Sequence, residues 1–303
     1  MNHKKLFLSA VALGLGILFV APLQVLHAGV SPTVDTTTAA QTSLGTETAF
    51  NLTDGSTTPL YVHGQFTDAD GCPDVTSVSG VFYKTNVSGA DACTPDNNNC
   101  YTIGSGICSI TNCDGGGDFS ANYQCTLPVQ FYADATAAGP SSGTDWTAKI
   151  TATDAAVLTG SNADVTEINQ LLALNGGNIS YGTMVVGGVS AQQNNSVQNT
   201  GNTGLDMNVS SSAMTCTSGS IPQANTHYTL SLFEGTFDEA AWAAETPLSA
   251  TPTNVEFDLA PQTNDASSIF RSIYFALKLP VGVSGSCTGT ITLDGTVDTE
   301  GGW

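Results

Sequence analysis

The sequence predicts an all-β protein made of two antiparallel β-sandwich domains behind an N-terminal leader. Short runs of alternating apolar and polar residues recur along the chain and end at clusters of Gly, Asn and Asp, as in antiparallel sandwiches. Only 11% of the 303 residues are charged, and the abundant Thr and Gly suit strands and turns. The cysteines form two groups, six between Cys72 and Cys125 and then Cys216 and Cys287, which indicates two separately cross-linked modules.

Residues 1–28 have the pattern of a secretory signal peptide. Lys4 and Lys5 precede an apolar run over residues 6–21, Pro22 interrupts the run, and Ala28 is the small residue expected before a cleavage site. An uncleaved membrane anchor is the alternative, because the apolar segment is just long enough to span a bilayer. We favour cleavage, which predicts a secreted or cell-surface protein that would contact a membrane only through an uncleaved leader.

The acidic composition restricts the partners of the protein. Six Lys and Arg residues oppose 26 Asp and Glu residues, which gives a formal net charge of −20 at pH 7. Such a chain repels the phosphates of nucleic acids, so we exclude nucleic-acid binding. Other envelope proteins and surface glycans remain as candidate partners.

A polar segment over residues 29–45 predicts a flexible lead-in to the first sandwich, which we place over residues 46–155. Leu60, Val62 and Phe66 lie on one face of an early strand, because side chains two residues apart in a strand point the same way. The segments VTSVSGVFY, YQCTLPVQFYA and WTAKITATD have the composition of further strands.

Residues 156–174 are predicted to form either a linker or a short helix. Val165, Ile168, Leu171 and Leu172 have helical spacing, whereas the polar residues around them are equally typical of a linker. A second sandwich is predicted over residues 175–303, where apolar residues alternate in segments 205–209, 228–232 and 273–279.

Two pairs of segments carry a resemblance to known families. The strand that ends in FTDADG (66–71) and the strand WTAKITATD (146–154) resemble the immunoglobulin-like domains of the polycystic-kidney-disease and cadherin type on prokaryotic surfaces. Residues 179–202 and 279–292 resemble immunoglobulin-like domains that accompany anchoring or sugar-active modules. The resemblance implies two immunoglobulin-like sandwiches, and it indicates fold more than activity.

The cysteines of an exported chain are expected to form disulfides, although sequence alone leaves many connectivities open. Cys93 with Cys100 and Cys108 with Cys113 each enclose a short turn-rich loop. This leaves Cys72 with Cys125 as a clamp between strands, and Cys216 with Cys287 in the second module.

The turn DADGCPD is the strongest metal-site signal. Asp68, Asp70 and Asp74 surround a Gly turn, and calcium prefers several carboxylate oxygens. In the resembled families calcium lies between consecutive domains, and Asp154 occupies the exit-strand position of such a site. The alternative is a turn in which these side chains cap their own backbone. Calcium is the one cofactor we consider.

No enzyme is predicted. His63 and His227 lie in different modules, and the GxSxG match at residues 139–143 lies between two strands instead of between a strand and a helix. Trp242 is a candidate for stacking on sugars, although a role in packing is favoured.

The sequence therefore favours an exported, non-enzymatic structural or adhesive protein of the cell surface, stiffened by calcium between its modules. A carbohydrate-binding accessory module is one alternative. A pilin-like or surface-layer subunit that donates residues 29–45 to a neighbour is the other.

Overall fold

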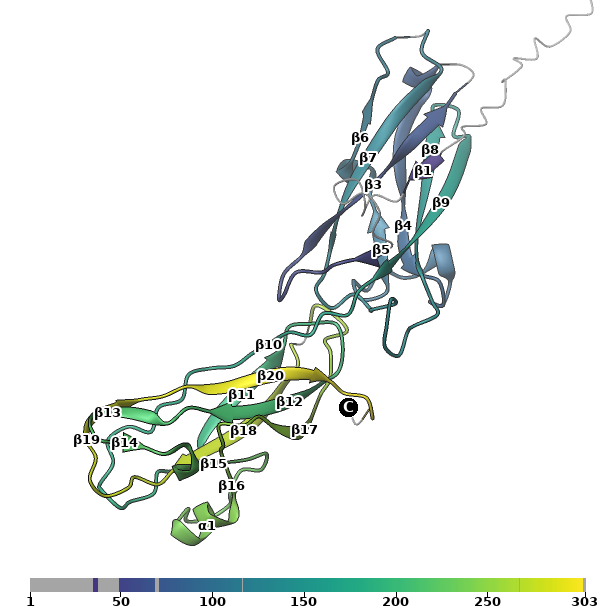
Figure 1. The fold of residues 1–303 in the computed structure, drawn as a ribbon. Coiled ribbons are helices and arrows are strands. Elements are labelled where there is room, and N and C mark those ends of the chain that lie inside the picture. Colours follow the sequence, from purple (N-terminus) through teal and green to yellow (C-terminus); the bar gives the residue numbers. More distant parts are fainter. Residues whose placement is uncertain (1–34, 38–48, 69–70, 116, 267, 302–303) are drawn as a thin grey trace, which may run out of the picture.

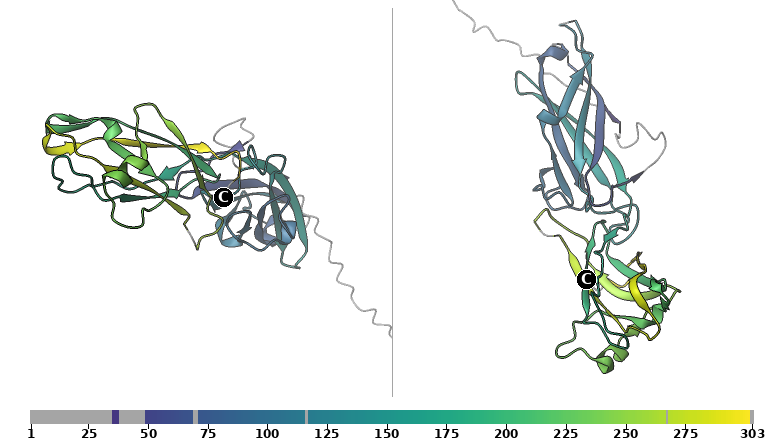
Figure 2. Two further views of the ribbon diagram at one scale, coloured as in Figure 1. Left: turned by 90° about the horizontal axis from the view of Figure 1, so that it is seen from below. Right: turned by 90° about the vertical axis from the view of Figure 1, so that its left-hand side faces the viewer.

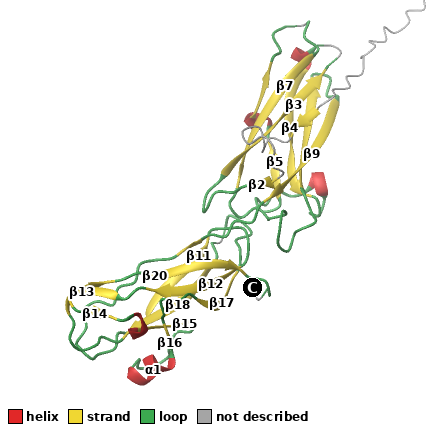
Figure 3. Cartoon of the chain, in the orientation of Figure 1, coloured by secondary structure: helices red, strands yellow, loops and turns green. Residues whose placement is uncertain are grey.

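The computed structural model describes residues 35–37, 49–68, 71–115, 117–266 and 268–301. Two β-sandwiches lie end to end, with their long axes at an angle (Figures 1 and 2). The helical elements are short and lie in connections between strands (Figure 3). The all-β fold is therefore confirmed. Within the described ranges, no helix has the length and hydropathy needed to span a membrane. The predicted leader lies outside the described residues.

The first sandwich has a four-stranded sheet in the order β1-β3-β7-β6 and a five-stranded sheet in the order β2-β9-β8-β4-β5. All pairings are antiparallel except the short parallel one between β2 and β9. The strands are β1 Asp35–Thr37, β2 Ala49–Phe50, β3 Thr58–Thr67, β4 Val75–Lys84, β5 Cys100–Ile103, β6 Cys108–Thr111, β7 Ser120–Val129, β8 Trp146–Asp154 and β9 Thr159–Ile168. Its described residues also form the 3-10 turns η2 Cys72–Asp74, η3 Ala90–Ala92 and η4 Ser105–Ile107.

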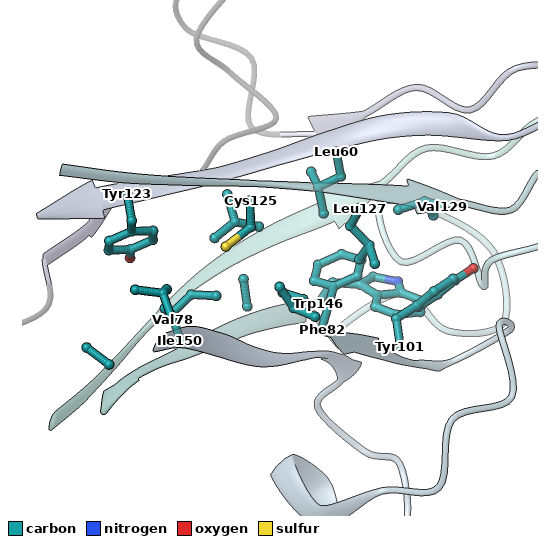
Figure 4. Close-up of a cluster of buried hydrophobic side chains, with 14 of the residues drawn as sticks. Leu60, Val78, Phe82, Tyr101, Tyr123, Cys125, Leu127, Val129, Trp146 and Ile150 are labelled. Carbon is teal, nitrogen blue, oxygen red and sulfur yellow. The ribbon is translucent and has the colours of Figure 1, made fainter. Parts of the chain in front are cut away.

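The core of the first sandwich is filled from both sheets (Figure 4). Leu60, Val62 and Phe66 of β3 are buried on one face, in agreement with the period-two pattern of their segment. Trp146 is fully buried and stacks on Phe82, with ring centroids 4.6 Å apart. Its indole nitrogen donates a hydrogen bond to the Asp134 carbonyl at 2.9 Å, so the only polar atom of this side chain is satisfied inside the core.

The second sandwich has one sheet in the order β10-β11-β18-β15-β16, faced by the smaller sheets β17-β12-β20 and β14-β13-β19. The strands are β10 Leu174–Asn175, β11 Gln193–Asn199, β12 Leu205–Ser211, β13 Met214–Ser218, β14 Ser220–Ile221, β15 Thr226–Thr229, β16 Thr246–Pro247, β17 Thr253–Leu259, β18 Phe270–Leu277, β19 Ser284–Thr288 and β20 Ile291–Val297. The helix α1 Glu239–Ala244 and the 3-10 turn η5 Gln223–Asn225 complete this half.

The alternating residues of the second sandwich form its core. Leu205, Met207 and Val209 of β12 are buried, and so are Ile273 and Phe275 of the facing β18. The alternation stops being informative at the strand ends, since Leu232 lies beyond β15 and is exposed.

The prediction of a linker or short helix over residues 156–174 is wrong for most of that segment. Residues Thr159–Ile168 form β9, which pairs along its length with β8. Val165 is 53% exposed whereas Ile168 is fully buried, so these two residues do not share an apolar helical face. Strand pairing satisfies the free hydrogen-bonding edge of β8, which a helix would leave unpaired. Only residues 169–173 connect the sandwiches.

The predicted lead-in over residues 29–45 also contains a strand. Residues Asp35–Thr37 form β1, which pairs with β3 at the edge of its sheet. A strand pairing holds this stretch although its composition is polar, because backbone pairing does not require apolar side chains. The rest of the lead-in lies outside the described residues.

All eight cysteines are paired. The structure pairs Cys93 with Cys100 and Cys216 with Cys287, as expected from the sequence. The other two expected pairs are wrong, because the bonds are Cys72–Cys113 and Cys108–Cys125.

The formation of β6 explains the exchange of partners. Cys108 begins β6 and lies directly opposite Cys125 on β7, with their Cα atoms 3.9 Å apart. An extended strand advances about 3.3 Å per residue, so β6 carries Cys113 away from Cys108. The amide of Cys72 donates to the Asp118 carbonyl at 2.7 Å, which holds η2 beside the loop that contains Cys113.

Candidate functional site

The described acidic residues of the predicted calcium site lie at one end of the first sandwich. Asp68 follows β3 and is buried, and Asp154 ends β8 and is buried opposite Val75. Asp154 Oδ1 accepts a hydrogen bond from the Leu158 amide at 2.6 Å, and the Asp74 carbonyl accepts one from the Ala155 amide at 2.9 Å. The Asp154 contact matches the expected alternative, in which acidic side chains cap the local backbone, whereas the Asp74 contact joins two main-chain groups.

The ligand set of that site is not assembled by the described residues alone. Among them, Asp68, Asp74 and Asp154 do not form a group with carboxylate oxygens within 4.8 Å of one another. Asp70 lies outside the described residues. Calcium binding at this turn stays a prediction.

The expected location of this site at the joint between the modules is wrong. The start of β3 lies near the second sandwich, where the Gly55 amide donates to the Thr200 carbonyl at 3.0 Å. Asp68 lies beyond the other end of this ten-residue strand, about 30 Å away. Asp68 and Asp154 therefore lie at the end of the first sandwich that faces away from the second, because β3 and β8 both end there (Figure 1).

The joint itself is held by Asn202, which is 6% exposed. Its Nδ2 donates to the carbonyls of Ala133 at 2.9 Å and Asn169 at 3.0 Å. Its Oδ1 accepts from the Leu171 amide at 2.7 Å. One side chain of the second sandwich thus satisfies main-chain groups of the first sandwich and of the connecting segment.

A glycine allows this close approach. An added Cβ at Gly201 would lie 2.0 Å from the Leu171 carbonyl oxygen and 3.0 Å from the Ala173 nitrogen. No side chain other than hydrogen fits there, so the connecting segment and the loop after β11 lie in direct backbone contact.

A second contact lies beside the first. Asp265, in the loop between β17 and β18, accepts a hydrogen bond from Asn97 Nδ2 at 2.6 Å and another from the Tyr132 hydroxyl. Burial and the bond to Asp265 raise the pKa of Tyr132 above its usual range, so the hydroxyl stays a donor. The two sandwiches therefore meet through hydrogen bonds from at least two loops.

Sequence reasoning missed a group of five carboxylates at the joint-facing end of the second sandwich. One carboxylate oxygen each from Asp206, Asp258 and Asp298 lies within 4.8 Å of the other two, and the same holds for Asp206, Glu256 and Glu300. Asp206 is near the start of β12, Glu256 and Asp258 lie on β17, and Asp298 and Glu300 follow β20. We call Asp206, Asp258 and Asp298 the inner triad.

The sequence held a signal for this group. Glu256 and Asp258 are two residues apart in VEFDL, and Asp298 and Glu300 are two apart in VDTE, so each pair shares one face of an extended chain. The pairing of both segments with β12, which brings Asp206 between them, is a non-local fact that the spacing does not reveal.

Trp242 does not present a free ring. It lies on α1 and stacks on His227 with centroids 3.9 Å apart, and Lys278 Nζ lies 5.4 Å from the ring centroid. His227 Nδ1 lies 2.8 Å from the Trp242 carbonyl oxygen. These contacts agree with the packing role that the sequence favoured, and glycan binding by Trp242 stays a prediction.

The second sandwich also has an open groove of about 1120 Å³. It lies between the segment that follows β10 and strands β19 and β20, and its apolar lining includes Tyr181, Met184, Leu279 and Val283.

Neither a protein-family model nor a curated protein matches this chain. Among solved structures, it is similar to dimeric latent PorU from Porphyromonas gingivalis, at 9% identity and a TM-score of 0.28, over 91% of this chain and 21% of that one. It is also similar to a chaperone–tip adhesin complex of CFA/I fimbriae, at 8% identity and a TM-score of 0.28, over 90% and 91% of the two chains. A third similarity is to the Yersinia pseudotuberculosis adhesin InvE, at 10% identity and a TM-score of 0.21, over 88% and 60%. This chain thus spans about a fifth of PorU. Similarities this weak support no inference about function.

Proposed function

We propose that this chain is an exported, non-enzymatic structural or adhesive protein of the cell surface. Its two sandwiches would act as stiff modules that hold their loops at a fixed spacing outside the cytoplasm. The observation that carries the proposal is the combination of complete cysteine pairing with a joint built from buried hydrogen bonds.

The disulfides support the extracytoplasmic part of the proposal. Four disulfides without a free thiol suit an oxidising compartment, whereas the cytosol keeps thiols reduced. The leader-like residues 1–28 supply the route out of the cell.

The joint supports the structural part of the proposal. Relative motion of domains is the usual expectation for a small polar interface. Here Asn202 and Asp265 tie the modules through buried or directed hydrogen bonds, and Gly201 brings the backbones into contact. A spacer needs a joint of this kind, because a free hinge would not fix the distance between its ends.

The two alternatives have less support. A carbohydrate-binding module needs an exposed aromatic platform, and Trp242 is stacked on His227. A strand-donating subunit needs a free donor segment, and part of residues 29–45 already pairs with β3 as β1. Calcium remains part of the proposal as a cation that stiffens the second sandwich, and its location is argued in the next subsection.

Labelling of intact cells tests the proposal. Cells that express the full chain are treated with a thiol-blocking reagent and then with an external protease. We expect the protein to be cleaved from outside and to contain no blocked thiol when it is analysed by mass spectrometry without reduction. A protease-protected protein with blocked cysteines would contradict the proposal.

A further inference from the structure

We propose that the inner triad of Asp206, Asp258 and Asp298 binds one hard divalent cation, with calcium preferred over magnesium. The site would lie at the joint-facing end of the second sandwich, among strands β12, β17 and β20. The choice of calcium rests on the proposed extracytoplasmic function, whereas the site itself rests on the geometry of these residues alone.

The inner triad is brought together by strand pairing. Asp206 is the second residue of β12, which lies between β17 and β20 in its sheet. Asp258 is near the end of β17, and Asp298 directly follows β20. Each contributes a carboxylate oxygen that lies within 4.8 Å of the others. Oxygens at such spacings can share one cation, because two ligands that each lie 2.3–2.6 Å from calcium are at most about 5 Å apart.

Asp298 is the residue that points to a ligand. It is 9% exposed, and its Oδ1 accepts hydrogen bonds from the amides of Glu300 at 2.9 Å and Gly301 at 2.8 Å. Its Oδ2 is buried and has no hydrogen-bond partner among the described residues. A buried carboxylate oxygen without a donor is unfavourable, and a cation beside it would remove the penalty.

Two hydrogen bonds fix the orientation of the Asp206 carboxylate. Its Oδ1 accepts from the amides of Phe257 at 2.8 Å and Asp258 at 3.1 Å. At the same place the register between β12 and β17 shifts, and Asp258 has a φ of +40°. Asp tolerates this left-handed backbone conformation better than most residues. The irregular end of β17 thus turns the Asp258 side chain toward its acidic neighbours instead of continuing the regular ladder.

The charge around the inner triad is poorly balanced. Five carboxylates gather there, and among the described residues Arg271 contacts one of them, with Nη1 3.1 Å from Asp258 Oδ2 and 3.2 Å from the Asp258 carbonyl. Carboxylates this close together repel one another. A bound divalent cation would relieve this repulsion.

The inner triad is a better site than the outer group of Asp206, Glu256 and Glu300. Glu256 and Glu300 are exposed, so water already solvates their carboxylates and a cation would gain less there. In the inner triad, Asp206 and Asp298 are both buried. Calcium is preferred because it accepts irregular oxygen cages, whereas magnesium requires a near-ideal octahedron.

The cation would connect this end of the second sandwich to the joint. The Asp298 amide donates to the Gly204 carbonyl at 3.0 Å, and Gly204 is two residues from Asn202. A cation on Asp298 would therefore fix the residues after β20 against the loop that meets the first sandwich.

Calcium titration of the purified exported protein, after treatment with a chelator, tests the proposal. We expect one calcium ion per chain by isothermal titration calorimetry and weaker binding of magnesium. Asp298→Asn should weaken calcium binding by about tenfold or more, because it removes a charged ligand. Asp294→Asn removes the same charge from an exposed position on β20 and should leave binding unchanged.

One further variant keeps the test decisive if Asp298→Asn misfolds. Glu256→Gln with Glu300→Gln alters only exposed side chains and should weaken calcium binding a few-fold through lost long-range attraction. Absence of calcium binding by the wild-type protein would refute the site. So would abolition of binding by the double Gln variant, because the exposed glutamates would then be the ligands. A refuted site would remove calcium from the proposed function but leave its extracytoplasmic structural role standing, because that role is tested by surface exposure and thiol state.

Discussion

Replacing Asn202 by Ala tests the joint most sharply. The substitution deletes two donors and one acceptor while it leaves the backbone free to keep its conformation. Three main-chain groups lose their partner: the carbonyls of Ala133 and Asn169 and the amide of Leu171. Because Asn202 is 6% exposed, water has little access to replace these bonds.

The expected loss follows from the number of hydrogen bonds. A buried hydrogen bond contributes about 1 kcal/mol net, so three of them contribute about 3 kcal/mol to the free energy of unfolding. This is a large part of the total for a typical domain, which is about 5–15 kcal/mol.

Urea unfolding followed by circular dichroism measures the effect. Asn202→Ala should lower the free energy of unfolding by about 3 kcal/mol, whereas Asn254→Ala, an exposed Asn on β17, should change it by less than about 0.5 kcal/mol. If both variants unfold at the wild-type urea concentration, the hydrogen bonds of Asn202 do not hold the joint.

Three further predictions concern Gly201, the disulfides and Glu245. Gly201→Ala should disrupt the joint, because the added Cβ would overlap the Leu171 carbonyl oxygen. Small-angle X-ray scattering should then show more freedom in the relative position of the two sandwiches. A scattering profile unchanged from wild type would argue against the close backbone contact. Replacing both Cys216 and Cys287 by Ser opens a loop with a sequence separation of 71 and should lower the free energy of unfolding by about 4 kcal/mol. The same change at Cys93 and Cys100, which are 7 residues apart, should lower it by about 2 kcal/mol. Equal losses would contradict the loop-entropy reasoning. Burial raises the pKa of Glu245, so the contribution of this group to stability falls as the pH rises from the ordinary glutamate pKa through the raised value. Thermal melts should therefore show Glu245→Gln more stable than wild type at neutral pH but not below about pH 4, and an advantage that persists at low pH would exclude ionisation as its cause.

The sequence predicted the fold because the signal for each strand is local. Leu60, Val62 and Phe66 identify the buried face of β3 by their spacing alone, and Leu205, Met207 and Val209 do the same for β12. Neither inference needs to know which strand lies alongside.

Features that depend on strand pairing were predicted poorly. Cys108 bonds to Cys125 because β6 pairs with β7 in one particular register, which no spacing within residues 108–113 reveals. The apparent helical spacing of Val165 and Ile168 was misleading for the same reason, since pairing with β8 determines their conformation.

The candidate metal sites show the same limit. Asp68 and Asp154 were correctly expected at strand ends, but the end they share faces away from the second sandwich, and only the direction of β3 and β8 reveals this. The carboxylates near the joint come from β12, β17 and the residue after β20, which are distant in sequence.

Small-angle X-ray scattering of the purified exported protein, in calcium and with a chelator, tests the central claim most directly. Two sandwiches fixed by Asn202 and Asp265 predict one scattering profile that matches the angled, end-to-end arrangement of Figure 1. A profile that only a broad ensemble of relative domain positions can fit, in either condition, would contradict a stiff joint.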